Sequence, residues 1–149
     1  MGALYRTDFF GWTRQQSALL RDVEAGRVVE PGELDWLALA EEIEGLGRSL
    51  QWDLYARYKL LLVQLLRACY QPGFNSGSFR LLVSVLRREV VKLLEDNPSL
   101  RDCRGEEFAD AWGAARLTMS ALSGLPEDHF PLACPFTLDQ VEDDSFWPD

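Results

Sequence analysis

The residues best suited to chemistry in this sequence lie in one short segment, AEEIEGLGRS, at positions 40–49. This segment contains three glutamates, two glycines and one arginine within a leucine-rich stretch of helical character. Glycine inside a helix costs about 0.5–1 kcal/mol relative to alanine, so a helix that only packs has little use for two of them. The composition therefore indicates that the segment holds something specific.

Helical geometry singles out Glu44 within this segment. Ala40 falls at the centre of the stripe that we expect to face inward. At about 100° per residue, Glu44 lies about 40° from that centre, Glu41 lies at its edge and Glu42 points outward. Arg48 follows one turn later, in the favourable order of acid before base. We predict that Glu44 is largely buried and paired with Arg48, and that Glu41, Glu44 and Arg48 form a binding site. A structural brace between Glu44 and Arg48, on a helix bent at its glycines, is the alternative.

A second acidic pair, Glu107 and Asp110, repeats the i, i+3 spacing of Glu41 and Glu44. Two such pairs on facing helices can bridge hard cations, because Mg²⁺ accepts carboxylate oxygens together with water and substrate phosphate. This arrangement would suit a divalent-metal hydrolase with Glu41, Glu44, Glu107 and Asp110 as ligands. However, Asp110 points away from the apolar stripe of its own helix, which weighs against the metal site.

Other kinds of site have weaker support. The only histidine, His129, has no second histidine nearby to complete a metal or catalytic site. No hydroxyl or thiol has a base at motif spacing, and no glycine-rich phosphate loop follows a strand. Four cations lie outside the apolar face of the helix predicted at 79–95, and we interpret them as a solvated face or as a patch for an acidic partner or for internal carboxylates: Arg80, Arg87, Arg88 and Lys92.

Composition restricts the possible partners and compartments. The net charge of −9, from 24 acidic and 15 basic residues, disfavours binding to nucleic acids or anionic membranes. The three cysteines form no CxxC pair, so we expect no disulfides and a reducing compartment. We also expect no secretory signal and no membrane span, because no apolar run approaches the ~20 residues that a span requires. The expected location is cytoplasmic.

The elements that must position these residues are helices. The period of 3.6 recurs along almost the whole chain, whereas the alternation typical of strands does not. Positions 33–70 read as one long helix, or as two bent at Gly45 and Gly47, followed by a loop at 71–78. Other helices are expected from about Phe9 to Gly26, at 79–95, at 106–123 and after a capping box at Thr137. We predict an all-α compact bundle of four or five main helices in a single domain over residues 1–149.

A shared core and a docked tail complete this prediction. The proline-rich C-terminal tail carries Pro135, Phe136, Phe146 and Trp147, which hold too much apolar surface to remain in water. The predicted core consists of Leu61, Leu65, Leu82, Leu86, Val90, Phe108 and Trp112.

The order of several segments resembles the domain of unknown function 29 family (DUF29), a bacterial family of small helical proteins. The segments that carry the resemblance include YRTDFFGWTRQQSALLR, LDWLALAEEIEGLGRS, SGSFRLLVSVLRREV and SGLPEDHFPLACPFTLDQVEDDSFWPD. The resemblance implies an α-helical fold and supplies no activity, cofactor or partner. One departure concerns the metal hypothesis: where many relatives have His, Trp and Gln, this chain has Gln64, Ala68 and Cys69. A histidine ligand at that place would be lost here.

Two hypotheses of function follow. The first is a non-enzymatic binding or protein-interaction domain, with its site around Glu41, Glu44, Arg48 and the C-terminal tail and with a protein as the possible partner. The alternative is a Mg²⁺-dependent hydrolase of a phosphate-containing small molecule, which would use the four paired carboxylates.

Overall fold

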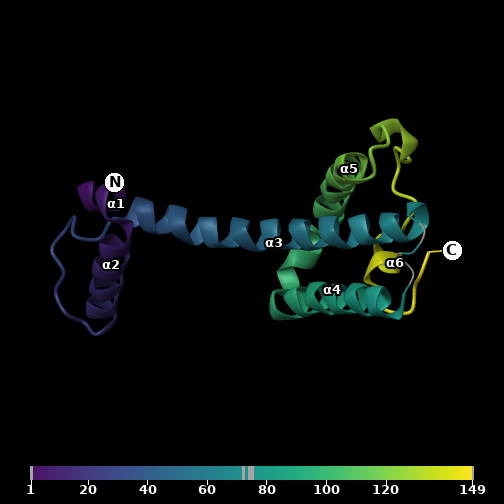
Figure 1. The fold of residues 1–149 in the computed structure, drawn as a ribbon. Coiled ribbons are helices and arrows are strands. Elements are labelled where there is room, and N and C mark those ends of the chain that lie inside the picture. The colour runs from purple at the N-terminus through teal and green to yellow at the C-terminus, as the bar shows by residue number, and fades with distance from the viewer. Residues whose placement is uncertain (1, 72, 74–75, 149) are drawn as a thin grey trace. The chain divides into compact units, whose positions relative to one another are not determined.

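The computed structural model describes residues 2–71, 73 and 76–148, and every regular element in this part of the chain is a helix (Figure 1). The helices are α1 (Ala3–Thr7), α2 (Phe9–Glu24), α3 (Trp36–Tyr70), α4 (Gly77–Asp96), α5 (Arg104–Ser123) and α6 (Leu138–Glu142), with two 3₁₀ helices, η1 (Pro98–Asp102) and η2 (Glu127–His129). The predicted all-α class is confirmed, with α2, α3, α4 and α5 as the long helices. The predicted loop at 71–78 contains Pro72, Phe74 and Asn75, which lie outside the described residues.

The chain divides into two compact units, residues 1–48 and residues 49–149, and each is described by itself. The helix α3 is continuous from Trp36 to Tyr70, so its first turns belong to one unit and the rest to the other. The interpretation of residues 1–149 as a single domain stays a prediction.

The first unit contains α1, α2 and the start of α3. Asp8 caps α2, because its Oδ1 accepts a hydrogen bond of 2.8 Å from the backbone N–H of Gly11. A Cβ atom at Gly11 would overlap the Asp8 carboxylate in its present position, so a side chain there would require the carboxylate to shift. The helix ends before Gly26, whose φ of 72° is the left-handed conformation that glycine favours.

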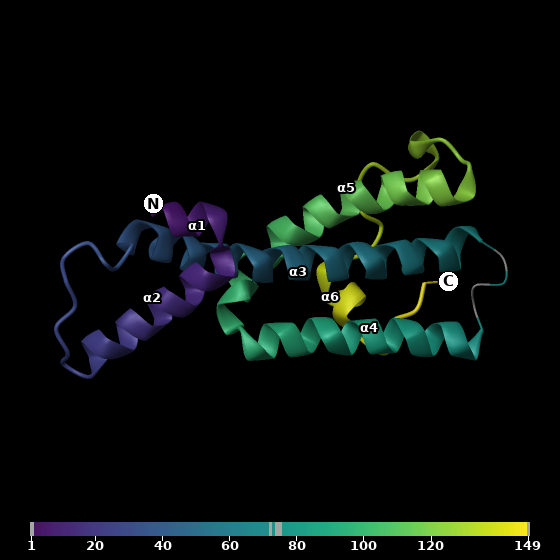
Figure 2. The ribbon, with the colours of Figure 1, turned by 60° about the vertical axis from the view of Figure 1, so that its left-hand side comes forward.

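The second unit packs the rest of α3 against α4, α5 and α6. Figures 1 and 2 show α4 beside this part of α3, with α6 between the two helices and α5 on the other side of α3. Most of the core residues that α3 supplies are leucines. The buried core of this unit includes Leu54, Tyr58, Leu61, Leu65, Val83, Leu86, Val90, Leu94, Ala111, Trp112, Ala115 and Met119.

The predicted core of this unit is confirmed except at one position. Leu61, Leu65, Leu86, Val90 and Trp112 are buried, and Phe108 packs against the core while partly exposed. Leu82 is 46% exposed, so its predicted burial was wrong. The buried stripe of α4 is centred on Val83, and Leu82 is rotated from it by about 100°, which takes its side chain to the edge of the stripe.

The C-terminal tail is docked, as predicted, but Pro135 is exposed, so its predicted burial was wrong. Phe136 and Val141 are buried, and Phe146 and Trp147 pack against the core. The helix α6 begins with the predicted capping box: Thr137 Oγ1 accepts from the backbone N–H of Gln140, and the Gln140 side chain accepts from the backbone N–H of Thr137.

An arginine of α4 holds this tail in place. Arg87 Nε donates a hydrogen bond of 2.8 Å to the carbonyl oxygen of Val141, and the Arg87 side chain is buried. The prediction that Arg87 belongs to a solvated face was therefore wrong. Arg87 lies four residues after Val83, on the buried stripe of α4, and its guanidinium satisfies carbonyls at the end of α6, a partner that the period of α4 does not reveal.

None of the helices in the described part of the chain is long and apolar enough to cross a membrane.

Candidate functional site

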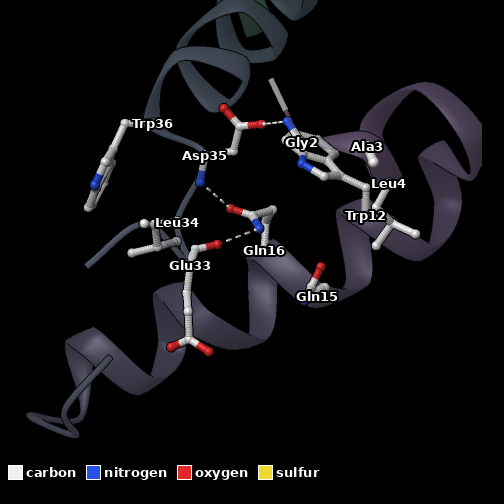
Figure 3. Close-up of a pocket in the computed structure, with 11 residues that line it drawn as sticks. Gly2, Ala3, Leu4, Trp12, Gln15, Gln16, Glu33, Leu34, Asp35 and Trp36 are labelled. Atoms are coloured by element: carbon white, nitrogen blue, oxygen red, sulfur yellow. Dashed lines mark hydrogen bonds between the residues drawn. The ribbon is translucent and has the colours of Figure 1, made fainter. Parts of the chain in front are cut away.

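A hydrogen-bonded clasp holds α2 to the residues that precede α3 (Figure 3). Gln16 Nε2 donates to the carbonyl oxygen of Glu33 over 3.0 Å, and Gln16 Oε1 accepts from the backbone N–H of Asp35 over 2.8 Å. Asp35 Oδ2 in turn accepts from the backbone N–H of Gly2 over 2.7 Å, and this bond lowers the pKa of Asp35. Gln16 is buried with both ends of its amide satisfied, so the clasp fixes where α2 meets α3.

Glu42 faces the N-terminal helices of its unit. Its Oε1 accepts a hydrogen bond from the hydroxyl of Tyr5, and this bond raises the pKa of the Tyr5 phenol. Glu42 is half-buried, so the prediction that it points outward was wrong. The bond joins α1 to the segment AEEIEGLGRS.

Glu44 is exposed, and its predicted burial was wrong. The Glu44 and Arg48 side chains are 74% and 66% exposed and lie 3.7 Å apart, an ion pair on the surface of α3. Ala40, the assumed centre of the inward stripe, is also exposed, whereas Ala38 is fully buried. The two alanines differ by a rotation of about 200°, so the real buried face is nearly opposite to the expected one.

The helices α2 and α3 enclose an apolar groove, which we call the α2–α3 groove. It has a volume of about 340 Å³, and its apolar lining includes Phe9, Trp12, Leu20, Leu39, Ile43 and Leu46. Ile43 and Leu46, both from the AEEIEGLGRS segment, are each 69% exposed. Glu42 is the one charged side chain among the described residues that line it. The AEEIEGLGRS segment therefore lines the α2–α3 groove with apolar side chains. Glu41, Glu44 and Arg48 of the same segment do not line the groove.

The four carboxylates proposed as metal ligands belong to two units. Glu41 and Glu44 lie in residues 1–48, and Glu107 and Asp110 lie in residues 49–149. Partial burial and the neighbouring charges of Asp110 and Glu106 raise the pKa of Glu107. Among residues 2–71, 73 and 76–148, no group of three or more His, Cys, Asp or Glu side chains is placed to hold a metal ion.

Sequence reasoning missed the residues that build the groove. Gln16 and Tyr5 were not singled out, because their partners Asp35, Glu33 and Glu42 are far along the chain. The sequence of α3 nevertheless contained a signal. Apolar residues occur on several sides of its first turns, at Trp36, Leu37, Ile43 and Leu46, and this is more apolar surface than one buried face requires.

These features define an all-α protein with an apolar groove between two helices. The chain belongs to the family described as "Domain of unknown function DUF29", whose model matches residues 4–147. The match covers nearly the whole chain and confirms the resemblance seen in the sequence. No curated protein matches the chain, and no solved structure matches it.

Proposed function

We propose that the protein is a non-enzymatic protein-interaction domain, and that the α2–α3 groove takes an amphipathic helix of another protein. The observation that carries this proposal is the exposure of Ile43 and Leu46 in an apolar groove of about 340 Å³. Large apolar side chains gathered on a surface indicate an interaction site, whereas scattered ones do not.

A helix is the occupant that the groove favours. Its walls are two helices joined by the clasp of Gln16, and the apolar face of a third helix would pack between them as in helix-in-groove recognition. Glu42 already accepts a hydrogen bond from Tyr5, so the groove offers a partner mainly apolar contacts. A unit of fewer than 50 residues also buries little apolar surface by itself, which makes a further helix energetically favourable.

Glu41, Glu44 and Arg48 remain part of the proposal as charged residues on the adjoining flank of the same turns of α3. They would contact a partner that extends beyond the groove. We also infer a cytoplasmic location, supported by the free state of Cys69, Cys103 and Cys134.

Site-specific photo-crosslinking tests the proposal. A photoreactive phenylalanine analogue at position 43 is introduced into the full chain in the organism that encodes it, and the same analogue at position 132 is the control. Leu132 is also an exposed apolar residue, but it belongs to the second unit. We expect a discrete adduct with another protein from position 43 and none from position 132. Identical adducts from both positions, or adducts only with a second copy of the chain, would contradict the proposal.

The captured protein then allows a quantitative test. Leu46→Asp should weaken its binding to the purified chain at least about tenfold, because a charge would be buried in the groove. Leu132→Asp should leave the affinity unchanged. Equal affinities for the two variants would show that the adduct did not report the groove.

A further inference from the structure

The polar side chains that line the α2–α3 groove have their hydrogen-bond donors already engaged or buried. Thr13 and Ser17 each donate their hydroxyl proton to a backbone carbonyl of α2, over 2.8 Å and 3.0 Å. Gln16 is buried and bonded at both ends of its amide in the clasp, and the indole N–H of Trp12 is buried away from solvent. Among the described residues, the lining therefore offers a partner hydrogen-bond acceptors only, since the two hydroxyl oxygens can still accept.

The strongest of these acceptors is Glu42, the one charged side chain in the described lining. Its Oε1 accepts from the hydroxyl of Tyr5. Within the described part of the chain its Oε2 makes no hydrogen bond, and it is not one of the buried polar atoms that lack a partner, so solvent reaches it. Leu39 and Leu46 lie one turn before and one turn after Glu42 on α3, and both line the groove. An open carboxylate oxygen thus lies within an apolar stripe.

A helix seated on Leu39 and Leu46 would cover Glu42 and remove this oxygen from water. Burial of an ionised carboxylate is strongly unfavourable unless a cation pairs with it, so a wholly apolar helix would be a poor ligand. The charge of the unit acts in the same direction, because acidic residues outnumber basic ones nine to five in residues 1–48. Arg14 and Arg21 of α2 do not line the groove.

We infer, on the basis of the proposed function, that the occupant of the α2–α3 groove is a cationic amphipathic helix, whose apolar stripe carries a lysine or arginine that pairs with Glu42 Oε2. Apolar side chains one turn before and one turn after this cation would contact Leu39 and Leu46. The methylene stem of the cation is itself apolar, so the charge reaches Glu42 without a break in the apolar contact. The carboxylate selects the partner, and the leucines supply most of the buried area.

Ile43 provides a specific reporter, because it lines the groove and is the only isoleucine of the sequence. The full chain labelled at the isoleucine δ1 methyl group therefore gives one signal, which comes from the groove. The probes are three synthetic helical peptides with the same leucine stripe and the same neutral polar face. They differ only at the central position of the stripe, which is lysine, norleucine or glutamate. We expect the lysine peptide to shift the Ile43 signal and to bind at least about tenfold more tightly than the norleucine peptide, and the glutamate peptide to bind most weakly.

Two variants that each remove one negative charge make the test specific. Glu42→Gln keeps an acceptor for Tyr5 and loses the charge, so the preference for lysine over norleucine should disappear. Glu44→Gln removes an exposed charge of the same helix that does not line the groove, and it should change this preference by less than about twofold. Equal effects of the two variants would overturn the inference, because the preference would then follow the charge of the unit and not a pair with Glu42.

Tyr5→Phe separates the charge of Glu42 from its hydrogen bond within the chain. This variant leaves the carboxylate in place and removes only the donor to Oε1, so the preference for lysine should persist. Loss of the preference in Tyr5→Phe would overturn the inference, because it would show that the bond from Tyr5, and not the open charge, determines binding.

The peptide titrations also distinguish this inference from the proposed function. Equal affinities of the lysine and norleucine peptides would overturn the cationic partner and leave a helix in the groove. No shift of the Ile43 signal with any of the three peptides would contradict the proposed function as well. A change of the Ile43 signal on dilution of the chain alone would assign the groove to a second copy of the chain in place of a cationic partner.

Discussion

Tyr58 in the middle of α3 donates a hydrogen bond to Glu142 at the end of α6, across 84 residues of sequence. Tyr58 is fully buried, and the other carboxylate oxygen of Glu142 lies 3.1 Å from Arg104 Nη1. The phenol, the carboxylate and the guanidinium thus connect three helices. Because each group satisfies its neighbour, the removal of one leaves a buried polar group with a poorer partner.

Tyr58→Phe tests this connection. We expect it to lower the free energy of unfolding by about 1–3 kcal/mol at neutral pH, because Glu142 loses a buried donor. Urea denaturation followed by circular dichroism measures the change. Tyr55→Phe, at a partly exposed tyrosine of the same helix, is the control and should have a smaller effect. Equal losses for both variants would contradict a specific role for the Tyr58 bond.

The same residue gives the protein a predicted alkaline pH dependence. Burial, and then the hydrogen bond to Glu142, raise the pKa of Tyr58 above its ordinary value. Above about pH 10 the unfolded chain releases this proton while the folded chain retains it, so stability should fall as the pH rises. The stability difference between the wild type and Tyr58→Phe should therefore shrink above that pH. Parallel curves of stability against pH for the two proteins would be the contrary result.

Leu86→Ala and Leu82→Ala form a matched pair one turn apart on α4. Leu86 is 8% exposed, so its truncation should leave a cavity and cost about 2–5 kcal/mol. Leu82→Ala should cost less than about 1 kcal/mol, because the side chain already contacts water. Chemical denaturation of both variants measures these losses in the free energy of unfolding. Comparable losses for the two variants would show that the buried stripe of α4 is not centred on Val83.

Removal of residues from Pro135 onward should strongly lower the melting temperature. The truncation deletes the buried Phe136 and Val141, each worth about 1.5–3 kcal/mol. It also leaves the buried Arg87 without its carbonyl acceptor and Tyr58 without Glu142. Thermal unfolding measured by calorimetry checks the prediction, and an unchanged melting temperature would mean that the tail does not belong to the core.

Glu44→Gln and Arg48→Met should each change stability by less than about 0.5 kcal/mol, because an exposed i, i+4 ion pair contributes little. Tyr5→Phe should instead lower the melting temperature of the first unit, because it removes the bond to Glu42. Differential scanning fluorimetry of the three variants provides the comparison. A large loss of thermal stability for Glu44→Gln, with no loss for Tyr5→Phe, would support the prediction from the sequence that Glu44 is the buried glutamate.

Millimolar Mg²⁺ or Mn²⁺ should leave the melting temperature unchanged, because the described carboxylates form no group able to hold an ion. A carboxylate cage would instead raise it by mass action on the folded state. A rise that disappears in Glu41→Gln or Glu107→Gln would favour the metal-dependent hydrolase.

The sequence predicted the burial of side chains best on helices where a single stripe of apolar residues could be identified. In α4 and α5 a stripe at spacings of three and four contains Leu86, Val90 and Trp112, so their burial followed from the period, although both helices also carry exposed apolar residues such as Leu81 and Leu117. In the first turns of α3 apolar residues occupy every face, and the period cannot choose between Ala38 and Ala40 as the centre. That ambiguity of rotation is why Glu44 was misplaced.

Contacts distant in sequence were beyond such reasoning. Arg87 was placed outside the apolar face of its helix, although it lies four residues after Val83 on the buried stripe. The carbonyl that accepts its hydrogen bond is at the end of α6, more than 50 residues later. The α2–α3 groove was missed for a similar reason: its walls are set by the bonds of Gln16 and Tyr5 to α3 and the residues before it. The docked tail was foreseen because its aromatic content is too high for solvent.

The placement of α6 also has a consequence for biosynthesis. The second unit needs Val141 and Glu142 to complete its core, and the ribosome adds them 54 residues after Arg87 and 84 residues after Tyr58, respectively. Until they emerge from the exit tunnel, the nascent chain carries Tyr58 and Arg87 without their partners. Domains generally fold as units during synthesis, so this unit is expected to reach its native packing only after residue 142 has left the exit tunnel, while residues 1–48 can fold earlier.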